Sequence, residues 1–219
     1  MAKIKQTLPN DAYLDNPLLK LVNRKHKLRS EIAFRKFKIG RESFDVSILE
    51  NLLAFLAAAE KKMFKLTLVS GYRSIAQQQK LFDNSLTVYT KQGFSDRDAV
   101  KQVLAYLQAP GASEHHTGLA VDIVDSSFLK EKGDLYPEAD QLPSQQWLIS
   151  NAPKFGFILR FPKGKEAFTG VKYESWHFRY VGRENAQFIS SQRLSLEEYI
   201  DLLKKEQRDK LFIQTQYNE

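Results

Sequence analysis

Apolar residues recur at two spacings along the chain, and each spacing predicts one kind of element. In 47–64, four leucines occupy the i, i+3, i+4 and i+7 positions of a helix, which Asp45 or Ser47 can cap. Later segments repeat helical periodicity, and several begin at a capping serine or end at a glycine. These further helices are predicted at 75–93, 95–108, 144–156 and 194–207.

Short runs rich in β-branched and aromatic residues predict strands between these helices. They begin the segment 65–74 and fill 119–124, 157–161 and 175–181. Helices come first and strands then mix with helices, which is typical of an α+β fold with a small, largely antiparallel sheet flanked by helices.

The polar segment 1–16 predicts a flexible N-terminal arm, and 17–219 is long enough for a single domain with a sizeable core. No apolar run approaches the roughly 18 residues that a transmembrane helix needs. The first residues also lack the apolar stretch of a secretory signal, so we expect any export signal or anchor of the natural protein to lie outside this chain.

Charge and cysteine content narrow the chemistry. The chain has no cysteine, so any metal ion must be held by His, Asp or Glu. Its net charge of +7 would attract polyanions such as nucleic acid, anionic lipid or an acidic cell-wall polymer. The basic residues are spread along the chain without an aromatic and basic module, so we expect a solvated basic surface and no nucleic-acid binding.

The stretch GASEHHTGLAVDIVD, at 111–125, concentrates residues that can bind a metal ion. A catalytic zinc site takes three protein ligands and a water molecule. His115 and Asp122 can supply two ligands, and Gly118 permits the turn between them. The third ligand would come from His26 or His177, and the Lys/Arg-rich surroundings of His26 favour His177.

The strand that contains His177 raises a geometric question. Its alternation places Trp176, Phe178 and Tyr180 on one face and His177 on the other. Glu174 could act as the general base that takes a proton from zinc-bound water. A regular strand would put Glu174 and His177 on opposite faces, so this hypothesis requires a bulge or turn between them.

Two other interpretations of the same residues remain open on spacing alone. The histidines can be hydrogen-bonded structural residues, since a histidine and an aspartate seven positions apart are weak evidence for metal. A hydrolase triad of Ser113, His115 and Asp122 is conceivable, although no G-x-S-x-G motif surrounds Ser113. His116 would point away from His115 in an extended segment and is not expected to be a ligand.

Three motifs together carry a family resemblance. SEHHTGLAVD fits S-x-H-x-x-G-x-A-x-D, ESWH fits E-x-W-H, and SGYRSIAQQQ fits a Y-R-S-x-x-x-Q motif. With this order and context, most of the chain resembles the zinc D-alanyl-D-alanine carboxypeptidases. That family includes the vancomycin-resistance D,D-carboxypeptidases and the L,D-carboxypeptidases of Gram-positive bacteria.

The resemblance implies roles for individual residues. Glu174 would be the catalytic base. The zinc ligands on the sheet would be His115, Asp122 and His177. A further set would contact substrate: Arg73, with Gln78 and Ser113 near it, would hold its terminal carboxylate or the developing oxyanion, and Trp176 and Tyr180 would shape the pocket wall. For Trp176 and Tyr180, plain core packing is an equally open interpretation.

The resemblance also implies an activity and a setting. We expect an extracytoplasmic enzyme, in the cell wall or anchored to the membrane, that removes the C-terminal D-alanine from peptidoglycan stem peptides. The sequence leaves its oligomeric state open, and a monomer is assumed. Tetrapeptides, and hence L,D-carboxypeptidase activity, are favoured over D,D-pentapeptides. The alternatives are an L-alanyl-D-glutamate-type endopeptidase and a non-catalytic, zinc-stabilised binding module.

Overall fold

The computed structural model describes residues 7–209 and has the α+β architecture expected from the sequence. Its main sheet has four strands in the order β3-β4-β6-β5, and every neighbouring pair is antiparallel. The strands are β3 (Leu66–Ser70), β4 (Ala120–Asp125), β5 (Phe157–Phe161) and β6 (Glu174–Tyr180). All four overlap segments that the sequence predicts as strands, and β4 and β6 each extend one residue beyond them.

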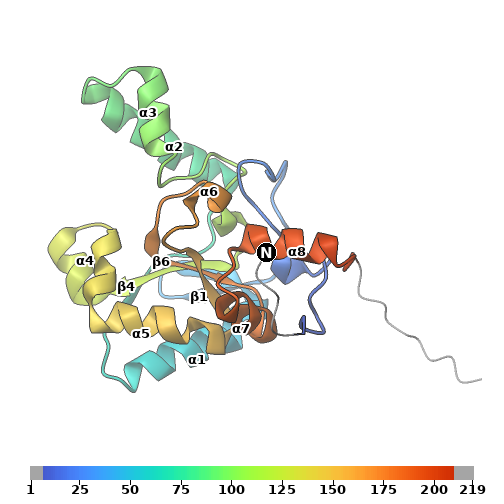
Figure 1. The fold of residues 1–219 in the computed structure, drawn as a ribbon. Helices are drawn as coiled ribbons and strands as arrows, with labels where there is room; N and C mark the ends of the chain where they lie inside the picture. The colour runs from blue at the N-terminus through green and yellow to red at the C-terminus, as the bar shows by residue number, and fades with distance from the viewer. Residues whose placement is uncertain (1–6, 210–219) are drawn as a thin grey trace, which may run out of the picture.

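Helices surround this sheet (Figure 1). Those in predicted segments are α1 (Leu49–Glu60), α2 (Ile75–Lys91), α3 (Asp96–Val103), α5 (Pro143–Asn151) and α8 (Leu196–Lys205). The sequence did not predict α4 (Ser126–Lys132), α6 (Glu166–Thr169), α7 (Arg183–Ser191) or the hairpin of β1 (Lys36–Ile39) and β2 (Glu42–Asp45). Among the described residues, no helix is long and apolar enough to cross a membrane.

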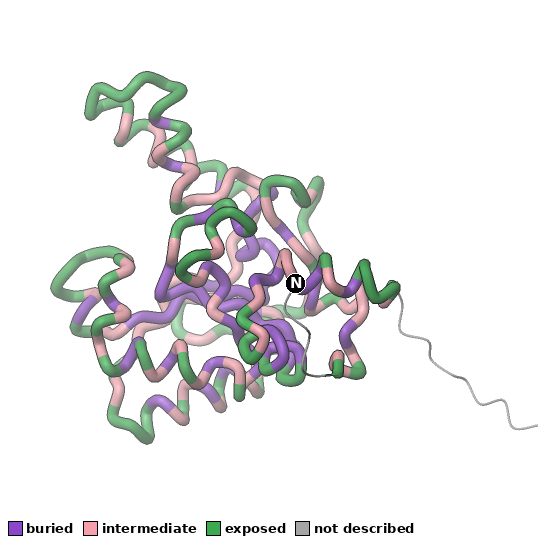
Figure 2. Tube along the Cα trace, in the orientation of Figure 1, coloured by how far each residue is buried: buried purple, intermediate pink, exposed green. Residues whose placement is uncertain are grey.

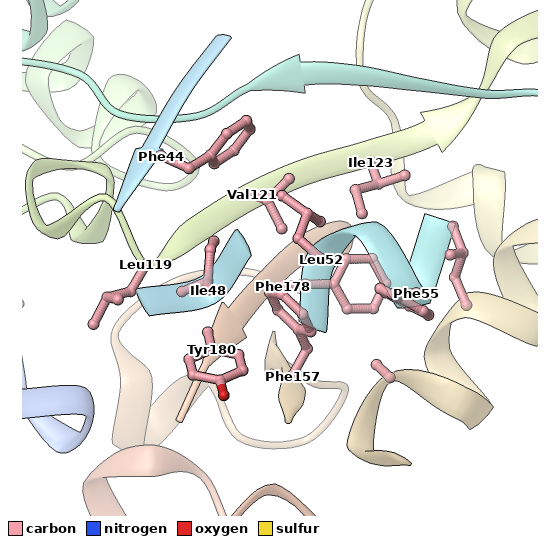
Figure 3. Packing of buried hydrophobic residues seen from close by; sticks show 12 residues of the cluster. Phe44, Ile48, Leu52, Phe55, Leu119, Val121, Ile123, Phe157, Phe178 and Tyr180 are labelled. Atoms are coloured by element: carbon pink, nitrogen blue, oxygen red, sulfur yellow. The ribbon is translucent and has the colours of Figure 1, made fainter. Parts of the chain in front are cut away.

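The main hydrophobic core lies between one face of the sheet and the helices α1 and α5. Figure 3 shows α1 presenting Leu52 and Phe55 to Val121 of β4 and Phe178 of β6. The Phe55 ring stacks on Phe157 with centroids 5.6 Å apart. Burying one such ring contributes roughly 1.5–3 kcal/mol, so this contact holds α1 firmly against the sheet.

The opposite face of the sheet is divided between polar residues and a second apolar cluster. In that cluster, Ile158 of β5 packs among residues of α7 and α8. Because side chains alternate along a strand, Asp122 lies on the face opposite the core residues Val121 and Ile123. One face of the sheet therefore carries polar side chains, and its other face is packed against the hydrophobic core.

The helices α2 and α3 project from the body of the protein (Figure 1). Their residues are mostly exposed or partly buried, in contrast to the buried central strands (Figure 2). The side chain of Ser74 accepts a hydrogen bond from the Gln77 amide and completes a capping box at the start of α2. The two helices therefore extend away from the sheet on one side of the molecule (Figure 1).

The described part of the predicted N-terminal arm, 7–16, is packed against the domain. Ala12 is fully buried. Arg208 donates hydrogen bonds to the carbonyl oxygens of Ala12 at 3.0 Å and Pro9 at 2.8 Å. The remainder of that arm and the last ten residues of the predicted domain lie outside the described residues, so the domain boundaries stay a prediction.

Candidate metal and active site

The register of the sheet aligns three polar residues across neighbouring strands. Ser70 of β3 lies opposite Asp122 of β4, and Asp122 lies opposite His177 of β6. Residues facing each other in this way are held a few ångströms apart by the backbone hydrogen bonds of the sheet. The strands thus fix Asp122 and His177 as neighbours before any side-chain interaction is considered.

A short helical turn brings His115 to the same place. The turn, η3 (Glu114–Thr117), begins after Ser113, whose Oγ accepts a hydrogen bond from the His115 amide, and ends at Gly118. Gly118 has φ = 71°, and a Cβ there would lie 2.6 Å from the Phe34 ring. Only glycine satisfies both the left-handed conformation and this close approach, as the sequence suggested.

His115, Asp122 and His177 form one buried group whose candidate ligand atoms all lie within 4.8 Å of one another. His115 Nε2 lies 3.2 Å from Asp122 Oδ2, and His177 Nδ1 lies 3.0 Å from Asp122 Oδ1. His115 Nδ1–H donates to the Gly71 carbonyl oxygen at 2.7 Å, which leaves Nε2 available as a ligand. The structure thus brings together the three residues that the sequence predicts as metal ligands, and their role as ligands stays a prediction.

The donor set of this group fits a zinc ion. Two imidazole nitrogens and a carboxylate oxygen are ordinary zinc ligands, and three protein ligands leave a coordination position for water. Asp122 Oδ1 is buried and has no hydrogen-bond partner among the described residues, although His177 Nδ1 is close. A buried carboxylate oxygen this close to an imidazole nitrogen can share a proton with it, and the same two atoms can bind a cation once the proton is released.

Burial and neighbouring charges set the protonation of the group. Burial alone would raise the pKa of Asp122, but His115 and His177 more than offset this and hold the pKa well below its usual range. Burial lowers the pKa of His115. Asp122 is therefore a carboxylate and His115 a neutral imidazole near pH 7, which are the forms that bind metal. Burial alone would lower the pKa of His177, but Asp122 and Glu114 raise it to about 9, so His177 must release a proton when it binds a metal ion.

Glu174 lies beside His177 because β6 is irregular. Leu159 of β5 pairs with Phe178, whereas Phe161 pairs with Glu174, so β6 contains extra residues between these two pairs. This is the irregularity that the sequence hypothesis required. It brings Glu174 Oε2 to 3.8 Å from His177 Nδ1, and burial raises the pKa of Glu174 to about 8, with His177 opposing the shift.

Arg73 is held at the edge of the group by its side chain and its backbone. Its Nη1 donates to Gln78 Oε1 at 2.8 Å, and its Nη2 donates to Ser70 Oγ at 2.7 Å. The His115 carbonyl oxygen accepts from the Arg73 amide at 3.1 Å, and His116 Nδ1–H donates to the Arg73 carbonyl oxygen at 2.6 Å. The guanidinium is thus positioned relative to the metal group.

A cavity of about 700 Å³ opens onto these residues. Its inner part is lined by Arg73, Ser113, Glu174, Trp176 and by the three residues of the metal group. Its outer walls come from α2, at Leu81, Ser85 and Tyr89, and from the segment before α5, at Leu135, Tyr136 and Pro137. The projecting α2 therefore forms one side of a channel that leads to the metal group.

Two of the predicted substrate-contacting residues lie elsewhere. Tyr180 belongs to the hydrophobic core, where its hydroxyl accepts a hydrogen bond from Asn51 at 2.9 Å. Gln78 is buried and acts on Arg73, and its Nε2 donates to the Gln108 carbonyl oxygen at 2.6 Å. The expected common face of Trp176 and Tyr180 is wrong, because the irregularity of β6 places Trp176 at the cavity.

The other two histidines have separate roles. His26 is exposed, and its Nδ1 lies 3.0 Å from Asn23 Oδ1, away from the metal group. His116 accepts from the Gly111 amide at its Nε2 and donates to Arg73 at its Nδ1, so both ring nitrogens are used by the backbone. His116 is thus not placed to be a ligand, as expected.

Sequence reasoning missed a buried charge network next to the metal group. Glu114 Oε1 accepts hydrogen bonds from Arg160 Nε and Arg179 Nη1, both at 2.8 Å. Burial alone would raise the pKa of Glu114, but the two arginines more than offset this and hold the pKa well below its usual range. Arg160 in the otherwise apolar strand β5, and Arg179 between two aromatic residues of β6, were the signal that could have revealed this network.

The fold and site together define a metallopeptidase-type protein: a buried His/Asp/His group and a buried carboxylate share a cavity with an arginine. The family model for VanY, D-alanyl-D-alanine carboxypeptidase, matches residues 41–183. The chain therefore belongs to the VanY family of D-alanyl-D-alanine carboxypeptidases, which confirms the family expected from the three motifs.

Individual relatives agree with this membership. A D-alanyl-D-alanine carboxypeptidase of Enterococcus faecalis is 34% identical over 182 residues, which cover 83% of this chain and 65% of that protein. The vancomycin-resistance D,D-pentapeptidase VanY of a VanB-type cassette, solved as a mutant with Zn(II), is 34% identical with a TM-score of 0.74, covering 84% of this chain and 99% of that one. The LD-carboxypeptidase LdcB is 32% identical with a TM-score of 0.69, covering 95% and 94%.

Proposed function

We propose that this carboxypeptidase removes the C-terminal D-alanine from peptidoglycan stem peptides in a zinc-dependent hydrolysis. One observation carries the proposal: the metal group, Glu174 and Arg73 line the same cavity. That combination supplies a site for zinc, a general base and a cation for a terminal carboxylate. The relatives named for D-alanine carboxypeptidase activity support the same reaction.

His115 Nε2, an Asp122 carboxylate oxygen and His177 Nδ1 would hold the ion. When bound there, zinc supplies Lewis acidity for the scissile carbonyl and lowers the pKa of a bound water molecule toward about 7. Glu174 accepts the proton of the attacking water on its carboxylate and later donates it to the nitrogen of the departing D-alanine. A buried carboxylate with a raised pKa is suited to both transfers.

Arg73 would bind the free C-terminal carboxylate of the stem peptide. Its two hydrogen bonds to Gln78 and Ser70 hold the guanidinium plane. A guanidinium carries five N–H donors, so others remain for a carboxylate, and its planar fork matches the two oxygens. Ser113 and Trp176 line the cavity next to it and would contact the terminal residues of the peptide.

We further propose a preference for tetrapeptide ends, and hence L,D-carboxypeptidase activity. The likeness to LdcB, at 32% identity over 95% of the chain, supports this preference. Stem peptides of the cell wall lie outside the cytoplasmic membrane, so we propose an extracytoplasmic location. The net charge of +7 would favour association with an anionic wall.

The test uses defined stem peptides and mass spectrometry. The zinc-loaded protein is incubated with tetrapeptide and pentapeptide substrates, each with a free and an amidated C-terminus, and with E174Q as the inactive control. We expect release of D-alanine from free ends and a rate at least about tenfold lower from amidated ends, because one charge-assisted pair contributes roughly 1.5–3 kcal/mol. R73K should also be impaired, because an ammonium cannot reproduce the planar fork.

Each other outcome points to another function. Equal cleavage of free and amidated peptides, with a cut inside the chain, would establish an endopeptidase. Peptide binding without any cleavage would establish a zinc-stabilised binding module. Faster release from pentapeptides than from tetrapeptides would keep the carboxypeptidase and reverse the proposed preference.

A further inference from the structure

Two buried polar atoms face each other beside the metal group. Glu114 Oε2 and His177 Nε2 are both buried without hydrogen-bond partners among the described residues, and they lie 3.7 Å apart. One is an acceptor, and the other is a donor in one of the two neutral forms of histidine. Leaving either atom unsatisfied costs free energy, so their juxtaposition requires a reason.

The position of the proton on His177 decides whether this residue can be a metal ligand. Nδ1 is the nitrogen close to Asp122 Oδ1, so it is the ring atom that faces the metal group. Nδ1 has a free lone pair in the neutral ring only when the proton is on Nε2. His115 shows the same arrangement reversed, since its Nδ1–H donates to Gly71 and its Nε2 is available.

Glu114 is held so that one oxygen remains for His177. Arg160 and Arg179 both donate to Oε1, which neutralises much of the charge and fixes the plane of the carboxylate. Oε2 receives neither arginine and points toward the imidazole. Because Glu114 directly precedes His115 on η3, the turn that carries one ligand also carries the partner of another.

The two arginines are in turn anchored from segments distant in sequence. Arg160 forms a two-point pair with Glu197 of α8, with Nη1 and Nη2 at 2.9 and 2.6 Å from the carboxylate oxygens. Arg179 Nη2 donates to the carbonyl oxygens of Leu18 and Lys20, both at 2.9 Å. These anchors lie outside the segment that the family model matches.

Resting on the proposed zinc site, we propose that Glu114 is a positioning residue of the metal centre. When zinc is bound, Glu114 Oε2 would approach from the present 3.7 Å, accept the Nε2–H of His177 and keep the Nδ1 lone pair directed at the ion. Metal-binding histidines commonly donate their second N–H to a carboxylate, which orients the ring and raises its basicity. If Glu114 only neutralised the two arginines, its Oε2 would not need to face His177.

The test compares E114Q with E197Q. Both substitutions remove a carboxylate that accepts from Arg160, but only E114Q touches His177. A glutamine amide at 114 would donate to His177 Nε2 and favour the proton on Nδ1. Zinc affinity is measured by competition with a chelator. We expect E114Q to bind zinc about 10- to 100-fold more weakly than wild type and E197Q to change by less than about threefold.

Nuclear magnetic resonance of the histidine side chains gives a second readout. In the zinc-loaded wild type, the His177 Nε2–H proton should be shifted downfield and exchange slowly with water, like the His115 Nδ1–H that donates to Gly71. If E114Q does not fold, the wild-type spectrum alone tests whether His177 Nε2–H is hydrogen-bonded. Rapid exchange at His177 Nε2–H, or equal zinc affinities of E114Q and E197Q, would overturn the role of Glu114. Absence of zinc binding by the wild type would instead overturn the metal site itself.

Discussion

Gln78 holds Arg73 from inside the fold. Its Oε1 accepts from Arg73 Nη1 at 2.8 Å, while its Nε2 donates to the Gln108 carbonyl oxygen at 2.6 Å. The amide is fully buried, so both of its polar groups are used and its orientation is determined. The direction of the guanidinium therefore depends on a residue that does not line the cavity.

Replacing Gln78 should impair substrate binding without affecting the metal. In Q78L, Arg73 loses a hydrogen bond that involves a charged group, which contributes about 1.5 kcal/mol, so we expect KM for a tetrapeptide to rise about tenfold. Zinc content should stay at the wild-type level. Q79L, at an exposed position of the same helix, is the matched control and should leave KM unchanged. An unaltered KM in Q78L would show that Arg73 is held by Ser70 alone.

Substitutions at Glu174 and His177 should distinguish a loss of catalysis from a loss of zinc binding. E174Q should retain zinc and lose activity by roughly 10²- to 10⁴-fold, which is the usual contribution of a general base. His177→Ala should lose zinc, because it removes one of the three proposed ligands. Elemental analysis and D-alanine release measure the two properties on the same samples. Loss of zinc from E174Q would make Glu174 a ligand.

The raised pKa of Glu174 predicts a pH-dependent stability of chelator-treated protein. Its pKa in the folded protein is about 8, compared with an ordinary value of 4.5, so the folded state holds a proton that the unfolded state releases between these values. The contribution of Glu174 to the free energy of unfolding is thus fully present below about pH 4.5 and is lost as the pH rises to about 8.

The comparison of wild type with E174Q isolates this effect, because glutamine has a similar shape and does not titrate. Urea unfolding of both chelator-treated proteins from pH 5 to pH 9 measures the difference between their free energies of unfolding. The free energy of unfolding of the wild type minus that of E174Q should decrease as the pH rises to about 8 and then level off. A difference that is constant, or that grows with pH, would contradict the raised pKa.

Two glycines with similar backbone angles should respond differently to alanine. Gly118 and Gly133 have φ = 71° and 75°, but a Cβ at Gly133 would meet nothing within 4 Å, whereas one at Gly118 would lie 2.9 Å from the Asp45 amide nitrogen. G133A should cost about 1–2 kcal/mol of stability from backbone strain alone. G118A should cost about 1–3 kcal/mol more from overpacking and should weaken zinc binding. Equal losses in urea unfolding would contradict the steric argument.

Much of the site could be predicted because its residues have distinctive chemistry. With four histidines and no cysteine in the chain, few donor sets were possible. His115 and Asp122 lie in one short stretch whose glycine marks the turn between them. The need for an irregular strand at Glu174 followed from the alternation of side chains, and the pairing of β5 with β6 shows that irregularity. The long helices followed from strong apolar periodicity.

The remaining features depend on tertiary contacts that local patterns do not contain. Strict alternation along β6 placed Trp176 with Tyr180, because the position of the extra residues is set by the pairing with β5. Gln78 stands in a run of three glutamines, and only the packing of α2 shows which one is buried. No role was predicted for Glu114 from the sequence, because its partners, Arg160 and Arg179, come from two later strands.

The anchoring of Arg160 by Glu197 has a consequence for synthesis of the protein. The ribosome completes His115, Asp122 and His177 before it reaches Glu197, which follows them in the chain. Until α8 emerges and docks, Arg160 lacks the carboxylate that binds two of its nitrogens, and burying it would leave a poorly compensated charge. The nascent chain therefore contains every proposed zinc ligand before it can close the charged cluster behind them, and that cluster should form only once α8 has emerged and docked.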